Sequence, residues 1–155
     1  MEPVSIEEAL GFDRPIVGIE LFKPNAKIPS YAYDTDSGAD LFSCEAIKIF
    51  PGETRIVSTG VKMEFPDGWA GRILEKSGLA LKQSVQIMGG VIDSSYRGEV
   101  NVIIHNASNT AILSFEVGDK VAQIEIYPVH QAKFEIVENV GDTERSANGF
   151  GSTGR

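Results

Sequence analysis

Short stretches of apolar and β-branched residues, separated by turn residues, follow one another along most of the chain. In the clearest stretch, apolar Ala122, Ile124 and Ile126 alternate with more polar residues. This period of two indicates β-strands that bury one face. We expect strands at 16–22, 46–50, 54–59, 61–65, 69–74, 85–92, 100–105, 111–115, 121–129 and 134–137. Many short strands with turn signals between them are typical of an all-β sandwich or barrel.

Three other segments depart from this strand pattern. Residues 77–82 are the only internal helix candidate, one or two turns long. Residues 1–15 form an N-terminal extension in which Ser5 and Glu8 have the spacing of a capping box, so either a short helix or a frayed tail is expected. Residues 139–155 are polar and rich in glycine and cannot build a core. We therefore expect a β-barrel domain at 16–138 followed by a flexible C-terminal arm.

Composition and charge exclude several classes of function. The 155 residues suffice for one domain, and 14 basic against 22 acidic residues leave a net charge of −8. This charge argues against a sequence-independent nucleic-acid binder. The single cysteine rules out an internal disulfide framework and a multi-cysteine zinc site, and two histidines far apart in the sequence argue against a histidine-based zinc centre. No apolar run approaches the roughly 20 residues that span a bilayer, and the N-terminus lacks a signal-peptide pattern, so we expect a cytoplasmic protein without membrane contact.

The glycine-rich segment 149–154 satisfies the pattern G-x-G-x-x-G. A dinucleotide-binding fold needs a strand before this motif and a helix after it, and only Arg155 follows here, so that fold is rejected. Small residues still allow backbone N–H groups to approach phosphate oxygens, and Ser152, Thr153 and Arg145 add donors. The structural alternative is an unstructured tail.

Two segments near the centre of the chain carry candidate chemistry. Lys76 and Ser77 place a cation and a hydroxyl where a strand ends and the short helix begins, which suits a phosphate group; the alternative is that Ser77 only caps the helix. Asp93 ends the first strand of a predicted hairpin at 89–100, and Tyr96 follows three residues later. These two residues suggest a slot for a flat ring, although an aspartate at a turn is usually structural.

Two further segments have weaker signals. Asp40 lies in the turn 37–41 that enters a strand, and it is a candidate carboxylate on the metal side of a site. Gln123 is a polar side chain within an apolar strand that follows the turn at 118–120. A turn residue and a solvated strand face are the respective structural alternatives.

Taken together in their order along the chain, the five segments resemble those of the trimeric deoxyuridine triphosphatases. The resemblance covers residues 16–154, and the motifs GVID, YRGE and GFGSTG are intact. The resemblance implies a jelly-roll-like β-barrel that assembles as a homotrimer with shared active sites. It also implies Mg²⁺-dependent hydrolysis of dUTP to dUMP and pyrophosphate, which limits uracil incorporation into DNA and supplies dUMP for dTMP synthesis. The C-terminal arm would close over the nucleotide.

The resemblance also assigns a role to each matched residue. Asp93 corresponds to the aspartate that activates the attacking water, Tyr96 to the aromatic residue that excludes a 2′-hydroxyl, and Asp40 to a residue that reaches the metal through water. The hairpin backbone would pair with uracil, and Phe150 would stack over it. The implied substrate-binding positions are Lys76, Ser77, Gly78, Gly90, Val91, Ile92, Asp93, Tyr96, Gln123, Arg145, Phe150, Gly151, Ser152 and Thr153.

Departures from the family pattern keep two alternatives open. Lys76 stands where arginine is usual, Ser95 replaces an aspartate, and 146–148 replace a more glycine-rich stretch. Lysine keeps the charge but loses the bidentate fork. A catalytically weak, dUTP-binding regulatory protein on the same fold is therefore one alternative. A relative of the dCTP deaminases is the other, but Ile103 occupies the position of their catalytic glutamate and cannot move protons.

Overall fold

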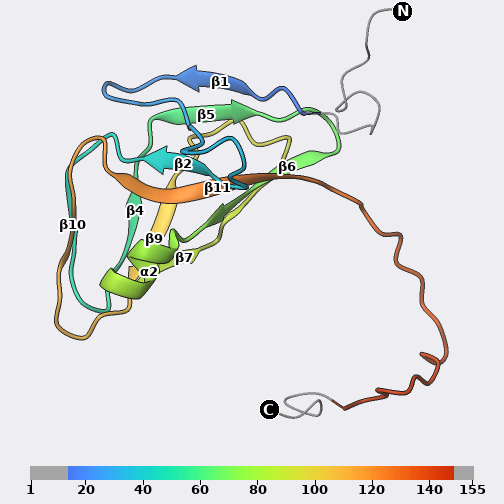
Figure 1. The fold of residues 1–155 in the computed structure, drawn as a ribbon. Helices are drawn as coiled ribbons and strands as arrows, with labels where there is room; N and C mark the ends of the chain where they lie inside the picture. The colour runs from blue at the N-terminus through green and yellow to red at the C-terminus, as the bar shows by residue number, and fades with distance from the viewer. Residues whose placement is uncertain (1–13, 149–155) are drawn as a thin grey trace, which may run out of the picture.

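The computed structural model describes residues 14–148, whose regular secondary structure consists almost entirely of short β-strands (Figure 1). The strands are β1 (Gly18–Leu21), β2 (Ala39–Phe42), β3 (Ile47–Ile49), β4 (Thr54–Val57), β5 (Val61–Glu64), β6 (Trp69–Leu74), β7 (Val85–Met88), β8 (Val91–Ile92), β9 (Val102–Asn106), β10 (Leu113–Phe115) and β11 (Lys120–Pro128). The helix α2 (Ser77–Gln83) lies between β6 and β7. The expected all-β fold with a short internal helix is confirmed.

The strands of the described region pair antiparallel in four small sheets. The largest has the order β2-β11-β6-β8, and a second has the order β4-β9-β7. β1 pairs with β5, and β3 pairs with β10. Most neighbours are far apart in sequence, as β2 and β11 are, and Figure 1 shows the sheets curving around a common interior. Such long-range pairing closes the chain into a barrel-like body.

The interior is filled by β-branched and other apolar side chains that point inward at every second position. In β9, Val102 and Ile104 are fully buried, whereas Ile103 between them is partly exposed. Asn106 is also fully buried, and its side-chain amide donates to the Ile49 carbonyl (2.9 Å). Buried polar groups need such partners because an unpaired one costs the free energy of its lost hydration. The period of two therefore sets which residues form the core.

Three strand predictions differ from the structure. Residues 39–41, expected within a turn, belong to β2 (Ala39–Phe42), which pairs with β11. The expected strand 85–92 is divided into β7 and β8 by Gly89, whose φ of +59° lies in the left-handed region that glycine tolerates. The expected strand 134–137 is wrong: this segment has no strand, and Phe134 (94% exposed) and Ile136 (104% exposed) are open to solvent. A strand requires a hydrogen-bonding neighbour, and this segment runs away from the body after β11 (Figure 1).

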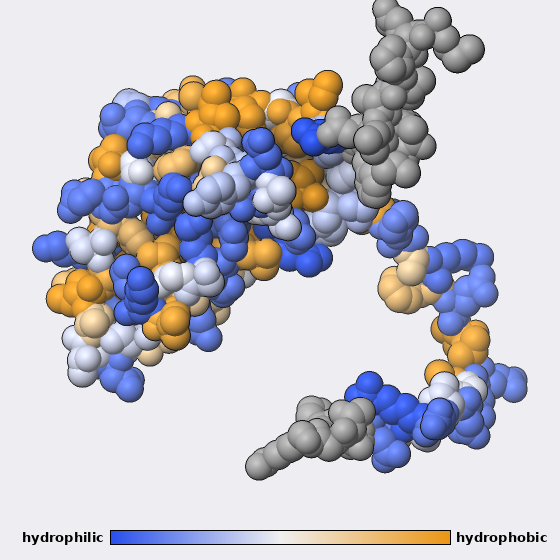
Figure 2. Space-filling view, viewed as in Figure 1, coloured by the Kyte–Doolittle hydropathy of each residue, from blue (hydrophilic) through white to orange (hydrophobic). Residues whose placement is uncertain are grey.

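Exposed apolar residues occur on several parts of the surface of the described region. Figure 2 shows apolar residues near β1 and β5 and again along the extended segment after β11. Around β1, the side chains of Ile19, Leu21 and Phe22 are each more than a third exposed. None of the helices within residues 14–148 has the length and apolar character needed to cross a membrane.

Candidate active site

A hollow of about 300 Å³ opens beside β8, the loop after it and the start of β9. Four residues predicted from the sequence line it: Val91, Ile92, Asp93 and Tyr96. They come together because β8 ends at Ile92 and the chain turns back through the loop at 93–99 toward β9. The hairpin that the sequence predicted thus forms one wall of a cavity that is large enough for a nucleobase and its sugar.

Gly90 holds the hairpin close to the neighbouring strand. A Cβ atom at this position would overlap the carbonyl oxygen of Ile73 in β6. The Ile73 N–H donates to the Gly90 carbonyl over 2.8 Å. β8 is the last strand of its sheet, so its other edge has no strand partner among residues 14–148. The backbone groups on that edge remain available for a ligand.

Tyr96 is held in a defined orientation at the hollow. Its hydroxyl donates to the Glu99 carbonyl over 3.1 Å, and its backbone N–H donates to the Asp93 carbonyl over 3.1 Å. A Cβ at Gly98 would overlap the Tyr96 hydroxyl, so only glycine lets the ring fold back over this loop. The ring is 44% exposed and presents a flat apolar wall to the cavity.

Asp93 lies exposed beside this wall. Its carboxylate makes no hydrogen bond or ion pair with any side chain of the described region. A carboxylate without a protein partner, at the mouth of a cavity, can hold and orient a water molecule. The aspartate therefore does not serve as a turn cap, which was the structural alternative for this residue.

The hollow also contains residues that the sequence reasoning missed as site residues. Ile56, Glu99 and Asn101 line it together with Ile103. The signal for Asn101 and Ile103 was present in the alternation of β9 and the residues before it, because Val100, Val102 and Ile104 are fully buried and the positions between them face the other way. No local sequence signal marked Ile56, which reaches the hollow because β4 pairs with β9.

A second polar cluster gathers around Asp40 in β2. The side chain of Asp40 is almost fully buried, and it forms ion pairs with Lys76 at Oδ1 and with Lys120 at Oδ2, the latter over 2.6 Å. The Lys120 contact is an ion pair without hydrogen-bond alignment. Lys120, at the start of β11, was not predicted as a site residue, and its position before an apolar strand was its only signal.

Gln123 belongs to the same cluster. It lies directly opposite Asp40 in the pairing of β11 with β2, and its amide donates to the Glu75 carbonyl over 2.7 Å. A Cβ at Gly38 would come within 2.6 Å of the Gln123 Oε1 atom, so the glycine makes room for this side chain. Asp40, Lys76 and Gln123, which lie far apart in the sequence, are thus brought together at one end of the sheet.

Ser77 does not cap the start of α2, which was the structural alternative for this residue. Lys76 is the N-cap residue and makes no side-chain cap, whereas Ser77 is the first residue of the helix. Gly78 has open space where a Cβ would be. Ser77 is exposed as well, so its hydroxyl is free of the usual capping role. Lys76, Ser77 and Gly78 together offer a cation, a hydroxyl and an accessible backbone.

The lysines determine the charge state of Asp40. Burial alone raises the pKa of its carboxyl, but the ion pairs with Lys120 and Lys76 outweigh burial and hold the pKa below its ordinary value of 3.8. Asp40 is therefore ionised at neutral pH. Because both of its oxygens face lysine ammonium groups, it does not present a free oxygen to a metal ion.

Replacement of Asp40 by asparagine is expected to lower the free energy of unfolding at pH 7 by about 1–3 kcal/mol. The folded-state pKa is depressed, so the charge contributes stability above pH 3.8 and loses it as the pH falls through the lower folded value. Urea unfolding of both proteins at a series of pH values measures the difference, with exposed Asp67→Asn as the control. A difference that stays constant in strong acid would contradict this account.

The two clusters lie far apart within one chain. Three strand steps separate β2 from β8 in the sheet, roughly 14 Å at the usual spacing. Gln123 pairs with Leu74, whereas Ile92 pairs with Gly71, which adds an offset of three residues or roughly 10 Å along β6. In a flat sheet these two offsets would place the backbones of Ile92 and Asp40 roughly 17 Å apart.

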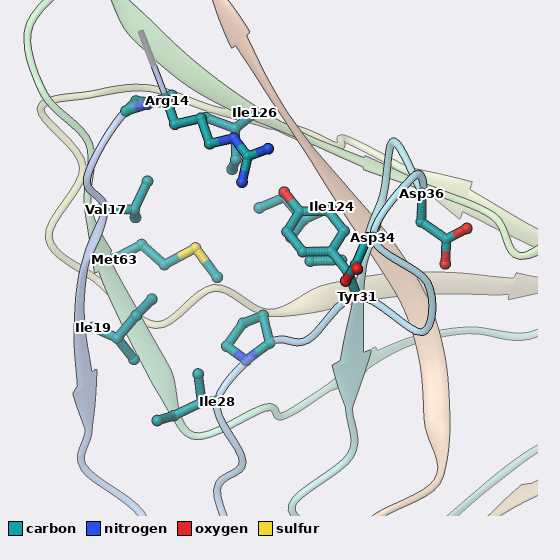
Figure 3. A pocket seen from close by; sticks show the side chains of 13 residues that line it. Arg14, Val17, Ile19, Ile28, Tyr31, Asp34, Asp36, Met63, Ile124 and Ile126 are labelled. Atoms are coloured by element: carbon teal, nitrogen blue, oxygen red, sulfur yellow. The ribbon is translucent and has the colours of Figure 1, made fainter. Parts of the chain in front are cut away.

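A larger hollow of about 830 Å³ lies on another part of the molecule, beside β1. Figure 3 shows the apolar side chains of Ile19, Ile28, Met63, Ile124 and Ile126 around one space, with Arg14 and Asp34 at its margin. It contains none of the residues predicted for the site. Polar side chains such as Arg14, Tyr31 and Asp34 also line it, but its lining is mainly aliphatic and includes none of the motif residues, so its size alone does not make it the active site.

The predicted arm residues are only partly described. Arg145 is exposed, and its Nε donates to the Asn148 carbonyl over 2.9 Å within a local turn. Phe150, Gly151, Ser152 and Thr153 lie outside the described residues. Their predicted contacts with the nucleotide therefore stay predictions.

The fold and the hollow together define the class, a β-barrel-like protein with a hollow at the predicted hairpin. The family model for dUTPase matches residues 24–154. The deoxyuridine 5'-triphosphate nucleotidohydrolase of Picosynechococcus is 44% identical over 84% of this chain and 93% of its own length. The enzyme of the same name from Clostridium tetani is 40% identical over 88% of this chain and 95% of its own length. The chain therefore belongs to the dUTPase family.

Solved structures agree with this assignment. The dUTPase of Staphylococcus bacteriophage 80alpha in complex with dUPNHPP superposes with a TM-score of 0.82 at 26% identity, covering 90% of this chain and 99% of the other. A mutant dUTPase of phage phi11, described with a structural Mg(II) ion, has a TM-score of 0.74 at 26% identity over 80% of this chain and 97% of its own.

Proposed function

We propose that this chain hydrolyses dUTP to dUMP and pyrophosphate by attack of water on the α-phosphate. The main observation behind the proposal is the hollow beside β8. It is lined by Asp93, whose carboxylate has no side-chain partner in the described region, by the Tyr96 ring and by the unpaired edge of β8. Membership in the dUTPase family and the names of the relatives support the same reaction.

In this mechanism, Asp93 acts as general base. Its carboxylate accepts a proton from a bound water, whose oxygen forms a bond to the α-phosphorus. The bond from that phosphorus to the oxygen bridging to the β-phosphate then breaks, and pyrophosphate leaves with the electron pair. A positioned base of this kind typically contributes about 10²–10⁴-fold to the rate. The exposed position of Asp93 allows a water to reach it.

The nucleoside is selected by shape and backbone pairing. The open edge of β8 offers the backbone N–H and C=O groups of Val91 to a uracil ring, and close pairing with this edge would exclude a 5-methyl group. The Tyr96 ring packs on the sugar and excludes a 2′-hydroxyl. Ile103 lines the same hollow with an aliphatic side chain, so the hollow offers no carboxylate there for the deamination of dCTP.

Mg²⁺ fits this site as a companion of the substrate. The described residues contain no group of three or more histidine, cysteine or acidic side chains that would hold a metal. Mg²⁺ prefers phosphate oxygens and water to an all-protein cage, and when bound it neutralises the charge of the triphosphate. At the hollow, Asp93 is a carboxylate that no side chain of the described region pairs, so it is the one that could approach the ion. Asp40, which two lysines neutralise, would act on the metal only through water.

A homotrimer with shared sites explains the distance between the two clusters. The reacting phosphorus must lie within a few ångströms of both its base and its phosphate-binding groups. Asp93 and the Lys76–Ser77–Gln123 cluster are too far apart in one chain to serve one phosphate. We infer that Asp93 of one copy faces the cluster of a second, and that the arm with Arg145 to Thr153 reaches a site of another copy.

The exposed apolar surfaces favour the same assembly. The segment with Phe134 and Ile136 leaves the body, and the hollow beside β1 is lined mainly by aliphatic side chains. Exposed apolar surfaces often mark contacts between proteins. Contact between copies would bury both. Light scattering is expected to report three times the mass of one chain, and a monomer at micromolar concentration would contradict the assembly.

The substrate is tested by measuring pyrophosphate release from dUTP, dTTP, dCTP and UTP side by side with Mg²⁺. We expect kcat/KM for dUTP to exceed that for each of the others by at least about 10²-fold, because each alternative meets a steric or pairing mismatch. Tight binding of dUTP without release of pyrophosphate would instead indicate a regulatory nucleotide sensor. Release of ammonia from dCTP would indicate a deaminase.

A further inference from the structure

The loop at 93–99 carries Asp93 and Tyr96, yet it has little packing to hold it in place. Its residues from Asp93 to Gly98 are exposed or only partly buried. At one end, Ile92 is fixed by pairing with Gly71 of β6. At the other end, the chain returns to the core at Val100, whose N–H donates to the Val61 carbonyl over 2.8 Å. Arg97 adds an exposed ion pair with Glu64 of β5 over 3.5 Å, so the more shielded contacts of Glu99, the last residue of the loop, are the stronger tie to the body.

Glu99 is held by three groups from two other segments. Its Oε2 accepts from Lys23 Nζ over 2.6 Å, and its Oε1 accepts from the Gly60 N–H over 2.8 Å. The Ser58 hydroxyl also donates to Oε1, and Lys23 donates to the same hydroxyl over 2.9 Å. We call Lys23, Ser58 and Glu99 the Glu99 anchor. It joins the loop after β1, the turn between β4 and β5 and the loop at 93–99.

The anchor is ionised and mostly shielded from water. Only 12% of the Glu99 side chain is exposed, against 39% for Lys23. Burial by itself raises the pKa of Glu99, but the hydrogen bonds from Lys23, Ser58 and Gly60 outweigh it and keep the pKa below the usual value. A charged hydrogen bond is about twice as strong as a neutral one, so this anchor holds the loop more firmly than the backbone contacts of Glu99 alone.

The anchor acts directly on Tyr96. The Tyr96 hydroxyl donates to the carbonyl of Glu99 itself, so a shift of the Glu99 backbone moves the ring. Glu99 also lines the hollow beside Tyr96 and Asp93. We propose that the Glu99 anchor positions Tyr96 and thereby sets the discrimination between deoxyribose and ribose nucleotides. This inference rests on the proposed function, because it assumes that the Tyr96 ring is the wall that meets the sugar.

The test compares kcat/KM for dUTP and UTP in three variants. Glu99→Gln and Lys23→Met remove the charge of either partner, and Lys23→Arg keeps it. We expect the first two to lower the dUTP/UTP ratio by about tenfold, and to change this ratio more than they change kcat for dUTP. Lys23→Arg is expected to keep the ratio of the unaltered protein. Glu20→Gln, which removes a surface ion pair with Lys62, is the matched control and should change neither value.

Different results of this experiment would overturn the inference about the Glu99 anchor and the proposed function. If the unaltered protein prefers dUTP and both charge-removing variants keep its dUTP/UTP ratio, the anchor does not position Tyr96 and the inference is overturned. Lys23→Met alters a partly exposed residue, so it remains testable if Glu99→Gln does not fold. If the unaltered protein does not hydrolyse dUTP, the proposed function fails. The Kd values for dUDP and UDP, measured by calorimetry, then decide the inference in the same variants.

Discussion

Replacing Asp93 by asparagine is expected to lower kcat for dUTP by about 10²–10⁴-fold while the nucleotide still binds. The amide keeps the shape of the side chain but cannot accept the proton of the attacking water. Because Asp93 has no hydrogen bond or ion pair to a side chain of the described region, the exchange removes no structural contact. Pyrophosphate release gives kcat, and calorimetry with a non-hydrolysable dUTP analogue gives Kd.

The control for this experiment is Asp67→Asn, which removes an exposed carboxylate from the turn before β6. It is expected to leave kcat and Kd unchanged. If Asp93→Asn turned dUTP over at nearly the normal rate, Asp93 could not be the base, and the water would have to be activated by another group. A large loss of affinity with normal kcat would assign Asp93 to binding instead.

Truncation after Glu144 is expected to leave a folded, assembled protein that binds nucleotide but turns it over roughly 10²-fold more slowly or worse. The truncation removes Arg145 and the glycine-rich motif, which would supply donors to the phosphates and exclude water. The body of the protein does not depend on this part, because the segment after β11 lies away from the core (Figure 1). Circular dichroism and light scattering check fold and assembly, and kcat checks turnover.

Mixing the two inactive proteins tests whether sites are shared. If one site takes Asp93 from one copy and the arm from another, subunit exchange between Asp93→Asn and the truncated chain should create some complete sites. Activity is then expected to rise well above that of either protein alone. A mixture of Asp93→Asn with itself, treated in the same way, is the control. The absence of any gain after confirmed exchange would mean that each chain builds its own site.

Much of the fold was predictable because burial in a strand repeats every second residue. The alternation in 121–129 predicted β11, and the glycine and proline turns predicted where most strands end. The break at Gly89 was not predicted, because an apolar run looks the same whether a strand continues or bends. The segment 134–137 has the sequence of a strand and has no strand partner in one chain, since pairing depends on a neighbour that a local pattern does not contain.

The residues of the candidate site likewise fall into those that the sequence predicted and those that it did not. Asp93, Tyr96, Lys76 and Gln123 were identified from their motifs, and those motifs also indicated the family. Glu99 and Lys120 were not identified as site residues, because neither has a local feature that separates it from a solvated polar residue. Each acquires its place through a partner more than ten residues away, such as Asp40 for Lys120 and Lys23 for Glu99.

The sequence by itself determined the strand-rich fold class, the order of the five motifs and the chemical groups available for phosphate and nucleoside, because these depend on periodicity and residue type. Only the tertiary structure decided that Asp40 is neutralised by two lysines, that Glu99 ties the loop of Asp93 and Tyr96 to two distant segments, and that the two clusters lie far apart in one chain. The physical reason is that strand pairing brings together residues whose separation along the chain bears no relation to their distance in space.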